Sequence, residues 1–217
     1  MKSDAQIKAD VTAELKWEAE VDETKIGVAI SNGAVTLTGH VPTFRQKMAA
    51  KQATKRVAGV LAVVDHMDVL LEHFHRMTDE GLAERIANVL KWNVSVPDPG
   101  IKAEVNNGVV TLSGEVEWQY QRANILKNVE HVSGVVNVSN LINVKPRPHT
   151  ADIQHRIKDA LKRHADLEAT KVAIAVNNGT VTLTGSVESF DEMERVESAV
   201  WAAPGVTKVV DNLRITG

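Results

Sequence analysis

The side chains that could carry chemistry in this chain of 217 residues are carboxylates, hydroxyls and histidines, because it contains no cysteine. The lack of cysteine excludes disulfides, thiolate metal ligands and cysteine nucleophiles. Asp65 and Asp68 could pair as a general acid and base, but both fall in a predicted strand, and we interpret them as solvated residues. No residue has the spacing to a base that nucleophilic catalysis needs, and the glycine-rich phosphate-binding motifs are missing from the sequence. The sequence therefore predicts a protein that is not an enzyme and uses no cofactor.

Two of the eight histidines, His73 and His75, flank Phe74 in a predicted linker. A metal site needs several ligands at defined spacing, together with groups that orient them, and two imidazoles two residues apart do not provide these. The other histidines do not recur at equivalent places: they are His40, His66, His131, His149, His155 and His164. We expect solvated or packed linker histidines, with metal binding as the less favoured interpretation, and no metal site elsewhere.

Composition limits the partners and the compartment. Apolar residues make up 43% and charged residues 24%, as in soluble globular proteins, and only 4% are aromatic, so aliphatic residues must build the core. The formal net charge of −3 provides no basic field, and we expect no nucleic acid to bind. The amino terminus lacks the apolar segment of a signal peptide, and no apolar run reaches the ~18–20 residues of a membrane helix. The sequence as written predicts a cytoplasmic protein, or a periplasmic one if a leader was removed.

A repeat determines where all these residues lie. Residues 31–39, 106–114 and 177–185 each contain an Asn-Gly pair followed by Val-Thr-Leu. The Asn-Gly glycines are 108 − 33 = 75 and 179 − 108 = 71 residues apart, and the glycines of three later Gly-Val pairs repeat both spacings. The sequence therefore predicts three tandem domains at 1–70, 78–145 and 150–217, with linkers at 71–77 and 146–149. The predicted turn residues are Asn32, Gly33, Asn107, Gly108, Asn178, Gly179, Gly59, Gly134 and Gly205.

Each copy has the pattern of helix, strand, strand, helix, strand. In the first helix, Ile7, Val11 and Leu15 recur every four residues, which is typical of an amphipathic helix. Apolar residues alternate in the next two strands, and Asn-Gly suits a two-residue type I′ turn between them. Such a turn pairs Ile30 with Val35, and the corresponding pairs in the other copies are also apolar. The pattern predicts an α+β fold of three tandem two-layer domains, each a three-stranded sheet with two helices on one face.

The last strand of each copy follows the motif Gly-Val-x-x-Val-x-(Asp/Asn)-x-φ-x-Val, where φ is apolar. The motif stands at residues 59–69, 134–144 and 205–215, with Ile215 as the final residue of the third copy. Together with the strand Val-Thr-Leu-x-Gly, it resembles the BON domain, named for bacterial osmotic-stress and nodulation proteins. The resemblance covers nearly the whole chain. It implies a non-enzymatic binding or scaffold protein, linked to stress or envelope protection through weak association with phospholipid or protein.

The helix that follows the hairpin differs in charge between the copies. In the first copy its cations include Arg45, Lys47, Lys51 and Lys55. In the third copy its carboxylates include Glu188, Glu192, Glu194 and Glu197. Ordinary solvated faces explain both sets most simply. The basic face also suits an anionic phospholipid surface or an envelope protein. The contrast in charge suits head-to-tail docking of one chain on another, which would give a homo-oligomer in the form of a ring or a fibre.

Trp17 and Trp92 occupy equivalent positions at the end of the first helix, where the third copy has Arg163. We interpret the two indoles as packed at helix ends or between copies, with membrane or partner contact as the sharper alternative.

The two linkers differ in composition. The first begins with Leu70 and Leu71 and should pack on a neighbour, whereas Pro146 and Pro148 stiffen the second. The first two copies should therefore associate more closely than the last two. An alternative to phospholipid or envelope association is a self-assembling soluble protein that binds a small ligand or cation between domains or subunits.

Overall fold

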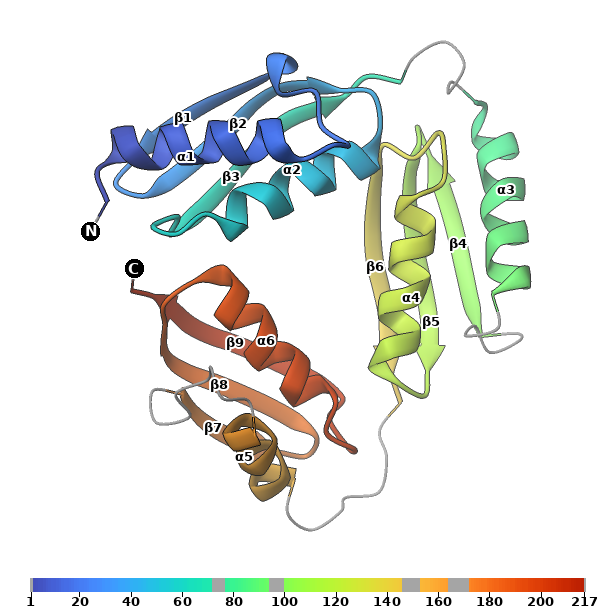
Figure 1. Ribbon diagram of the computed structural model, residues 1–217. Helices are drawn as coiled ribbons and strands as arrows, with labels where there is room; N and C mark the ends of the chain where they lie inside the picture. The colour runs from blue at the N-terminus through green and yellow to red at the C-terminus, as the bar shows by residue number, and fades with distance from the viewer. Residues whose placement is uncertain (1, 72–76, 94–99, 146–152, 164–171, 217) are drawn as a thin grey trace.

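Three small domains of the same architecture make up the chain in the computed structural model (Figure 1). The structure describes residues 2–71, 77–93, 100–145, 153–163 and 172–216, with the backbone alone at 154 and 161–163. Each domain has the order helix, strand, strand, helix, strand, and each sheet has three strands. The predicted α+β fold is confirmed. The predictions made for His73, His75, Pro146 and Pro148 lie outside the described residues.

The bounds of the elements match from domain to domain. The first domain consists of α1 (Asp4–Trp17), a 3₁₀ turn (Glu23–Lys25), β1 (Ile26–Ser31), β2 (Ala34–Val41), α2 (Phe44–Arg56) and β3 (Ala62–Val69). The second consists of α3 (Asp79–Trp92), β4 (Ile101–Asn106), β5 (Val109–Val116), α4 (Gln119–Glu130) and β6 (Asn137–Val144). The third consists of α5 (Ile153–Arg163), β7 (Val172–Asn177), β8 (Thr180–Val187), α6 (Phe190–Trp201) and β9 (Lys208–Ile215).

The hairpin sets the register of each sheet. Asn32 and Gly33 have φ angles of 50° and 75°, and both Asn-Gly pairs at 107–108 and 178–179 also have positive φ. Positive φ at both turn positions is the predicted type I′ conformation. Ile30 pairs with Val35 as expected, and the equivalent apolar pairs form in the other two sheets. The middle strand of each sheet then pairs in parallel with the strand that follows the second helix.

The apolar stripes of the first helices form one wall of each core. Ile7, Val11 and Leu15 of α1 are all buried, and so are the matching residues of α3. In α5, Ile153 and Ile157 are buried, while the side chain of the third predicted residue, at position 161, is not described. The opposite wall is the inner face of the sheet. Its fully buried members include Val35, Leu37, Val110, Leu112, Val181 and Leu183.

A carboxylate at the start of the first helix holds the hairpin turn. Asp4 accepts hydrogen bonds from the backbone N–H groups of Asn32 at 2.8 Å and Gly33 at 3.0 Å. Asp79 bonds the equivalent turn of the second domain at 2.7 and 3.0 Å. The spacing of 79 − 4 = 75 residues follows the repeat, so these two aspartates could have been found from the sequence. The equivalent position of the third copy is Thr150.

Aromatic residues at the start of α2 and α6 reach into neighbouring domains. Phe44 is buried in the core of the second domain, and Met48 and Val69 pack beside it. Phe190, at the equivalent position of the third domain, packs against the core of the first. Trp201, at the end of α6, packs against the cores of the second and third domains.

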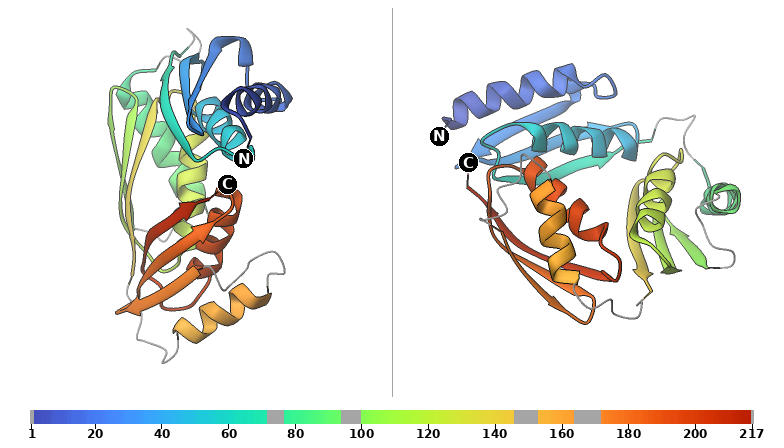
Figure 2. Two further views of the ribbon diagram at one scale, coloured as in Figure 1. Left: turned by 90° about the vertical axis from the view of Figure 1, so that its left-hand side faces the viewer. Right: turned by 60° about the horizontal axis from the view of Figure 1, so that its bottom comes forward.

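Each domain therefore contacts both others, and Figures 1 and 2 show α2 lying between α1 and α6. The contact between the first and third domains was not predicted from the linkers. Leu70 is exposed, against the prediction that it packs on a neighbour.

Candidate functional site

Among the described residues, the most exposed large apolar side chains are two tryptophans at equivalent helix ends. Trp17 ends α1 with 85% of its surface exposed, and Trp92 ends α3 with 81% exposed. Lys16 and Lys91 precede them and are exposed as well. The interpretation that these indoles pack at helix ends or between copies is wrong, because the buried stripe of each helix directs its last residue away from the core. Membrane or partner contact stays a prediction.

The other two tryptophans lie at the ends of second helices and are less exposed. Trp118 precedes α4 as its N-cap residue. Trp201 is partly buried where the second and third domains meet. Trp201 is therefore the tryptophan that packs between copies, and the sequence did not distinguish it from the two exposed indoles.

The basic helix α2 is paired with carboxylates of its own domain along most of its length. Arg45 donates from Nε to Glu20 at 2.8 Å, and its Nη2 pairs with the same carboxylate. The Nζ atoms of Lys47 and Lys51 lie 3.3 Å and 3.2 Å from Asp65 Oδ2. These pairs reduce the positive charge that α2 presents to a partner, so the predicted contact of this face with an anionic surface stays a prediction that the structure does not favour.

Asp65 is not the solvated strand residue that the sequence suggested. Its side chain is only 16% exposed and lies beneath α2, whereas Asp68 is exposed as expected. Burial would raise the pKa of Asp65. The hydrogen bond from the Met67 N–H, at 3.1 Å, and the positive charges of Lys51 and Lys47 outweigh burial, so the pKa lies below its ordinary value. Asp65 is thus an ionised anchor for the two lysines.

Lys55 reaches beyond its own domain. Its Nζ lies 3.4 Å from Glu194 Oε1 of α6 and 5.3 Å from the centre of the Phe190 ring. The cation therefore lies between a carboxylate and an aromatic face. The complementary charges of α2 and α6 meet within one chain, whereas the sequence predicted that they would meet between chains. Docking between chains stays a prediction.

The carboxylates of the acidic helix have different roles. Glu192 accepts the backbone N–H of Glu188 at 2.6 Å, while Ser189 Oγ accepts the N–H of Glu192 at 3.2 Å, so this pair caps α6. Glu194 contacts Lys55. Burial raises the pKa of Glu197, the charges of Asp211 and Glu194 raise it further, and Lys55 opposes them. Of the four glutamates predicted for self-association, Glu194 makes the contact with another domain that the structure shows directly.

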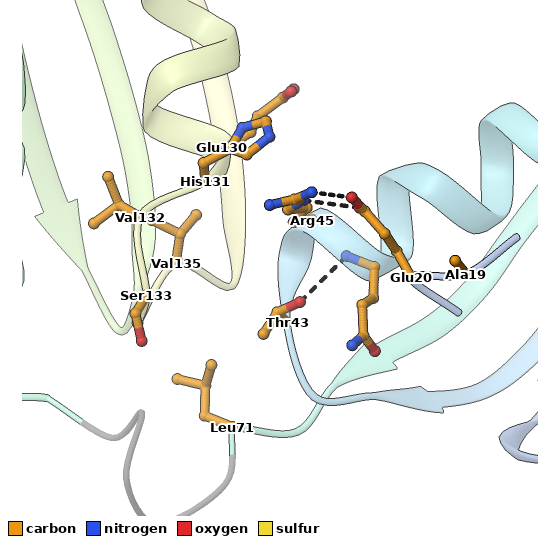
Figure 3. Close-up of a pocket in the computed structure, with 12 residues that line it drawn as sticks. Ala19, Glu20, Thr43, Arg45, Leu71, Glu130, His131, Val132, Ser133 and Val135 are labelled. Atoms are coloured by element: carbon orange, nitrogen blue, oxygen red, sulfur yellow. Dashed lines mark hydrogen bonds and ion pairs between the residues drawn. The ribbon is translucent and has the colours of Figure 1, made fainter. Parts of the chain in front are cut away.

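A cavity of about 460 Å³ lies between the first and second domains (Figure 3). Arg45, Thr43 and Glu20 line it from the first domain, and His131 and Val132 line it from the second, with Leu71 at the connection between them. Glu130 also lines the cavity; burial raises the pKa of its carboxyl, and the charges of His131 and Lys51 oppose the rise. Gln46 Oε1 is buried and finds no hydrogen-bond partner among the described residues. Binding of a small ligand between domains stays a prediction.

The described residues contain neither a cluster of metal ligands nor a helix that could span a membrane. No three histidine, aspartate or glutamate side chains of that part come together as a metal site would require. Within the same residues, none of the helices is long and apolar enough to cross a membrane.

Three positions in these contacts were not singled out from the sequence. They are Phe190, which packs on another domain, and the lysines that precede the exposed tryptophans, Lys16 and Lys91. Each had a signal in the repeat. Phe44 and Phe190 are 146 residues apart, which is the sum of the two repeat spacings, and the Lys-Trp pairs are separated by one spacing of 75.

Comparison with known proteins agrees with the repeat. The BON domain family model matches residues 3–70, 78–146 and 149–217. Osmotically-inducible protein Y of Escherichia coli (strain K12) is 27% identical over 146 residues, which cover 64% of this chain and 73% of that protein.

Two solved structures also align with the chain. The C-terminal domain of CdsD, a structural protein of the type III secretion system of Chlamydia trachomatis, aligns over 100% of both chains at 17% identity, with a TM-score of 0.27. The PrgH periplasmic domain aligns over 89% of this chain and 96% of its own, at 11% identity and a TM-score of 0.23. Scores this low do not indicate a shared arrangement of the whole chains.

Proposed function

Because the chain belongs to the BON domain family, as its motifs predicted, we propose that it is a non-enzymatic binding protein of the stress response that associates weakly with anionic phospholipid surfaces. The name of its osmotically inducible relative supports the stress role. The exposed Lys-Trp pairs at the ends of α1 and α3 support the surface contact. The absence of a catalytic constellation from the sequence supports a binding role over an enzymatic one.

The exposure of Trp17 and Trp92 is the single observation that carries this proposal. An indole has a large apolar body and one polar N–H, a combination that suits the boundary between lipid headgroups and acyl chains. Burial of a large apolar side chain stabilises by roughly 1.5–3 kcal/mol, so two exposed indoles can contribute that free energy to contact with an apolar surface. Two equivalent helices end in this way, which favours a common use over chance.

The preceding lysines add the preference for negative charge. Lys16 and Lys91 lie in the last turns of α1 and α3, where a cation also complements the helix dipole. A lysine near an anionic membrane surface contributes about 1 kcal/mol of attraction. The third copy has Lys162-Arg163 at the same positions and no aromatic residue. We therefore expect the first two domains to make the contact and the third to contribute little.

Vesicle binding tests this proposal. Large vesicles of phosphatidylcholine, with or without phosphatidylglycerol, are mixed with the protein at low salt, and binding is measured by co-sedimentation. We expect binding to the anionic vesicles only. The double variant Trp17→Ala, Trp92→Ala should bind at least about tenfold more weakly, since two indoles leave the interface.

Tyr120→Ala is the matched control, because Tyr120 is also an exposed aromatic residue but lies on α4. It should bind like the unaltered chain. Equal binding to neutral and anionic vesicles, or full binding by the double tryptophan variant, would overturn the proposal.

A further inference from the structure

The contact between α2 and α6 joins the first and third domains although its residues are far apart in sequence. Lys55 and Glu194, which are 139 residues apart, form the ion pair at 3.4 Å. Phe190 approaches Lys55 through its ring face and packs on the core of the first domain. The contact therefore combines one ion pair, one cation–π contact and a small apolar area.

The charges on α6 make Lys55 important to the contact. Glu194 and Glu197 lie one turn apart on α6, and the negative charges of Glu194 and of Asp211 on β9 both act on Glu197. Lys55 is the cation from the first domain that opposes this negative charge. The ion pair with Glu194 places this cation where the acidic side of α6 faces the first domain.

Both partners of the ion pair are partly exposed to solvent. The side chains of Lys55 and Glu194 are 34% and 48% exposed. Salt screens such pairs strongly, because the Debye length falls from about 10 Å at 0.1 M to about 3 Å at 1 M. By contrast, the lysine pairs on Asp65 lie within one domain, where the fold keeps the partners together whatever the salt concentration.

We propose that the contact of Lys55 with Glu194 and Phe190 is a salt-sensitive latch that closes the third domain onto the first at low ionic strength and releases it at high ionic strength. Release frees the acidic face of α6 and the end of α2 for other partners. A rise in ionic strength accompanies osmotic stress, so the latch would give the stress role a physical input. That last link rests on the proposed function, whereas the latch itself does not.

Distance measurements between the two domains test the latch without any lipid. The chain has no cysteine, so Ala13→Cys on α1 and Thr184→Cys on β8 place two spin labels at exposed positions without competing thiols. Double electron–electron resonance should give one narrow distance at 50 mM salt. At 1 M salt the distribution should broaden and shift to longer distances.

Charge exchange identifies the residues responsible. Lys55→Glu should broaden the distribution already at low salt and reduce the ratio of closed to open chains by a factor of about 5. Adding Glu194→Lys to that variant reverses both charges and remakes the ion pair without the cation–π contact, so it should restore most of the narrow distance. Lys102→Glu makes the same charge change at an exposed position of β4 and should leave the distance unchanged.

Carbodiimide cross-linking gives a second readout on the unlabelled chain. It couples amines to carboxylates in contact, so Lys55 should couple to Glu194 at low salt, with a several-fold lower yield at 1 M salt. The yields for Lys47 or Lys51 with Asp65 should fall much less, because these pairs are held within one domain. A distance that does not respond to salt or to Lys55→Glu, or a failure of the exchanged pair to restore it, would overturn the latch. Neither result bears on vesicle binding through Trp17 and Trp92.

Discussion

The first and third domains build the same contact between a helix and a strand with different charges. In the first domain, Lys51 of α2 lies 3.2 Å from Asp65 of β3. At the equivalent place in the third domain, Glu197 of α6 lies within electrostatic reach of Asp211 of β9. One backbone thus carries an attractive pair in one copy and a like-charged pair in another. The repeated apolar positions therefore specify the fold, while the helix surface differs with the contacts that each copy makes.

The pKa values of the two sites move in opposite directions. Burial acts against ionisation in both. In the first domain the two lysines and a backbone N–H overcome burial and lower the pKa of Asp65. In the third domain neighbouring carboxylates reinforce burial and raise the pKa of Glu197. The second domain is a neutral reference, since Leu126 and Asn140 occupy the equivalent positions.

The largest expected change in stability comes from the hydrophobic cores, which are alike in the first and third domains. Leu37 and Leu183 are equivalent and fully buried. Leu37→Ala and Leu183→Ala should each destabilise their own domain by about 2–5 kcal/mol, because each substitution leaves a cavity in a close-packed core. Hydrogen exchange read separately for each domain is the suitable measurement, since three domains need not unfold in one step.

An exposed leucine is the control for these core variants. Leu141 of β6 lies at the surface, so Leu141→Ala should change stability by less than about 0.5 kcal/mol. A loss below about 1 kcal/mol for either core variant would contradict the view that the two cores are equivalent, and would show that one domain depends on its neighbours for stability.

A smaller loss of stability is expected at the aspartate that holds the hairpin turn of the first domain, since the third domain has threonine at that position. Asp4→Thr gives the first domain the residue that stands at the equivalent position 150. It removes the acceptor for the N–H groups of Asn32 and Gly33, so we expect a loss of about 1–2 kcal/mol from the first domain. Amide exchange at the turn should accelerate first. Asp79→Thr should act in the same way on the second domain, and an unchanged turn in both variants would contradict the assigned role.

Much of the fold could be predicted because it follows from local patterns that occur three times. The Asn-Gly turn fixes two positive φ angles, and this fixes the register that brings Ile30 opposite Val35. The four-residue spacing of Ile7 and Val11 likewise predicts the buried face of α1. These inferences need only residues that are close in sequence.

The candidate site was predicted less well because its contacts join distant residues. Nothing near Lys55 in the sequence indicates that Glu194 lies beside it, and nothing near Asp65 shows that two lysines cover it. The exposure of Trp17 also depends on what packs around the end of α1, which a residue type does not specify. The charges of α2 were therefore identified correctly, but their partners were not.

Substitution of Lys51 and Glu197 by glutamine tests whether the charges at these equivalent positions affect stability in opposite directions. Lys51→Gln removes one partner of the largely buried Asp65 and should destabilise the first domain by about 1 kcal/mol. Glu197→Gln removes a carboxylate from beside Asp211 and should stabilise the third domain by a few tenths of a kcal/mol. Domain-resolved hydrogen exchange at pH 7 measures both. The exposed Glu104→Gln is the control, with little expected effect. Changes of the same sign at 51 and 197 would contradict the comparison.

The smallest effect is a difference in pH dependence between the same two domains. The folded-state pKa of Glu197 is raised above its ordinary value of 4.5, so folding favours its protonated form. Its contribution to stability is therefore fully present below pH 4.5 and is lost as the pH rises through the raised pKa. The pKa of Asp65 is lowered below 3.8, so its contribution is present above pH 3.8 and is lost as the pH falls through the lowered value.

Acidification from pH 7 to 4.5 should therefore stabilise the third domain relative to the first, and further acidification below pH 3.8 should weaken the first domain selectively. Because other carboxylates titrate over the same range, the informative quantity is the difference between each variant and the unaltered chain. Glu197→Gln should remove the upper change and Asp65→Asn the lower one, each in its own domain alone. If Glu197→Gln left the pH dependence of the third domain unchanged between pH 7 and 4.5, the like-charged contact would not control the titration. The difference in charge between α2 and α6 would then affect only the contact of Lys55 with Glu194 and Phe190, and not the stability of each domain.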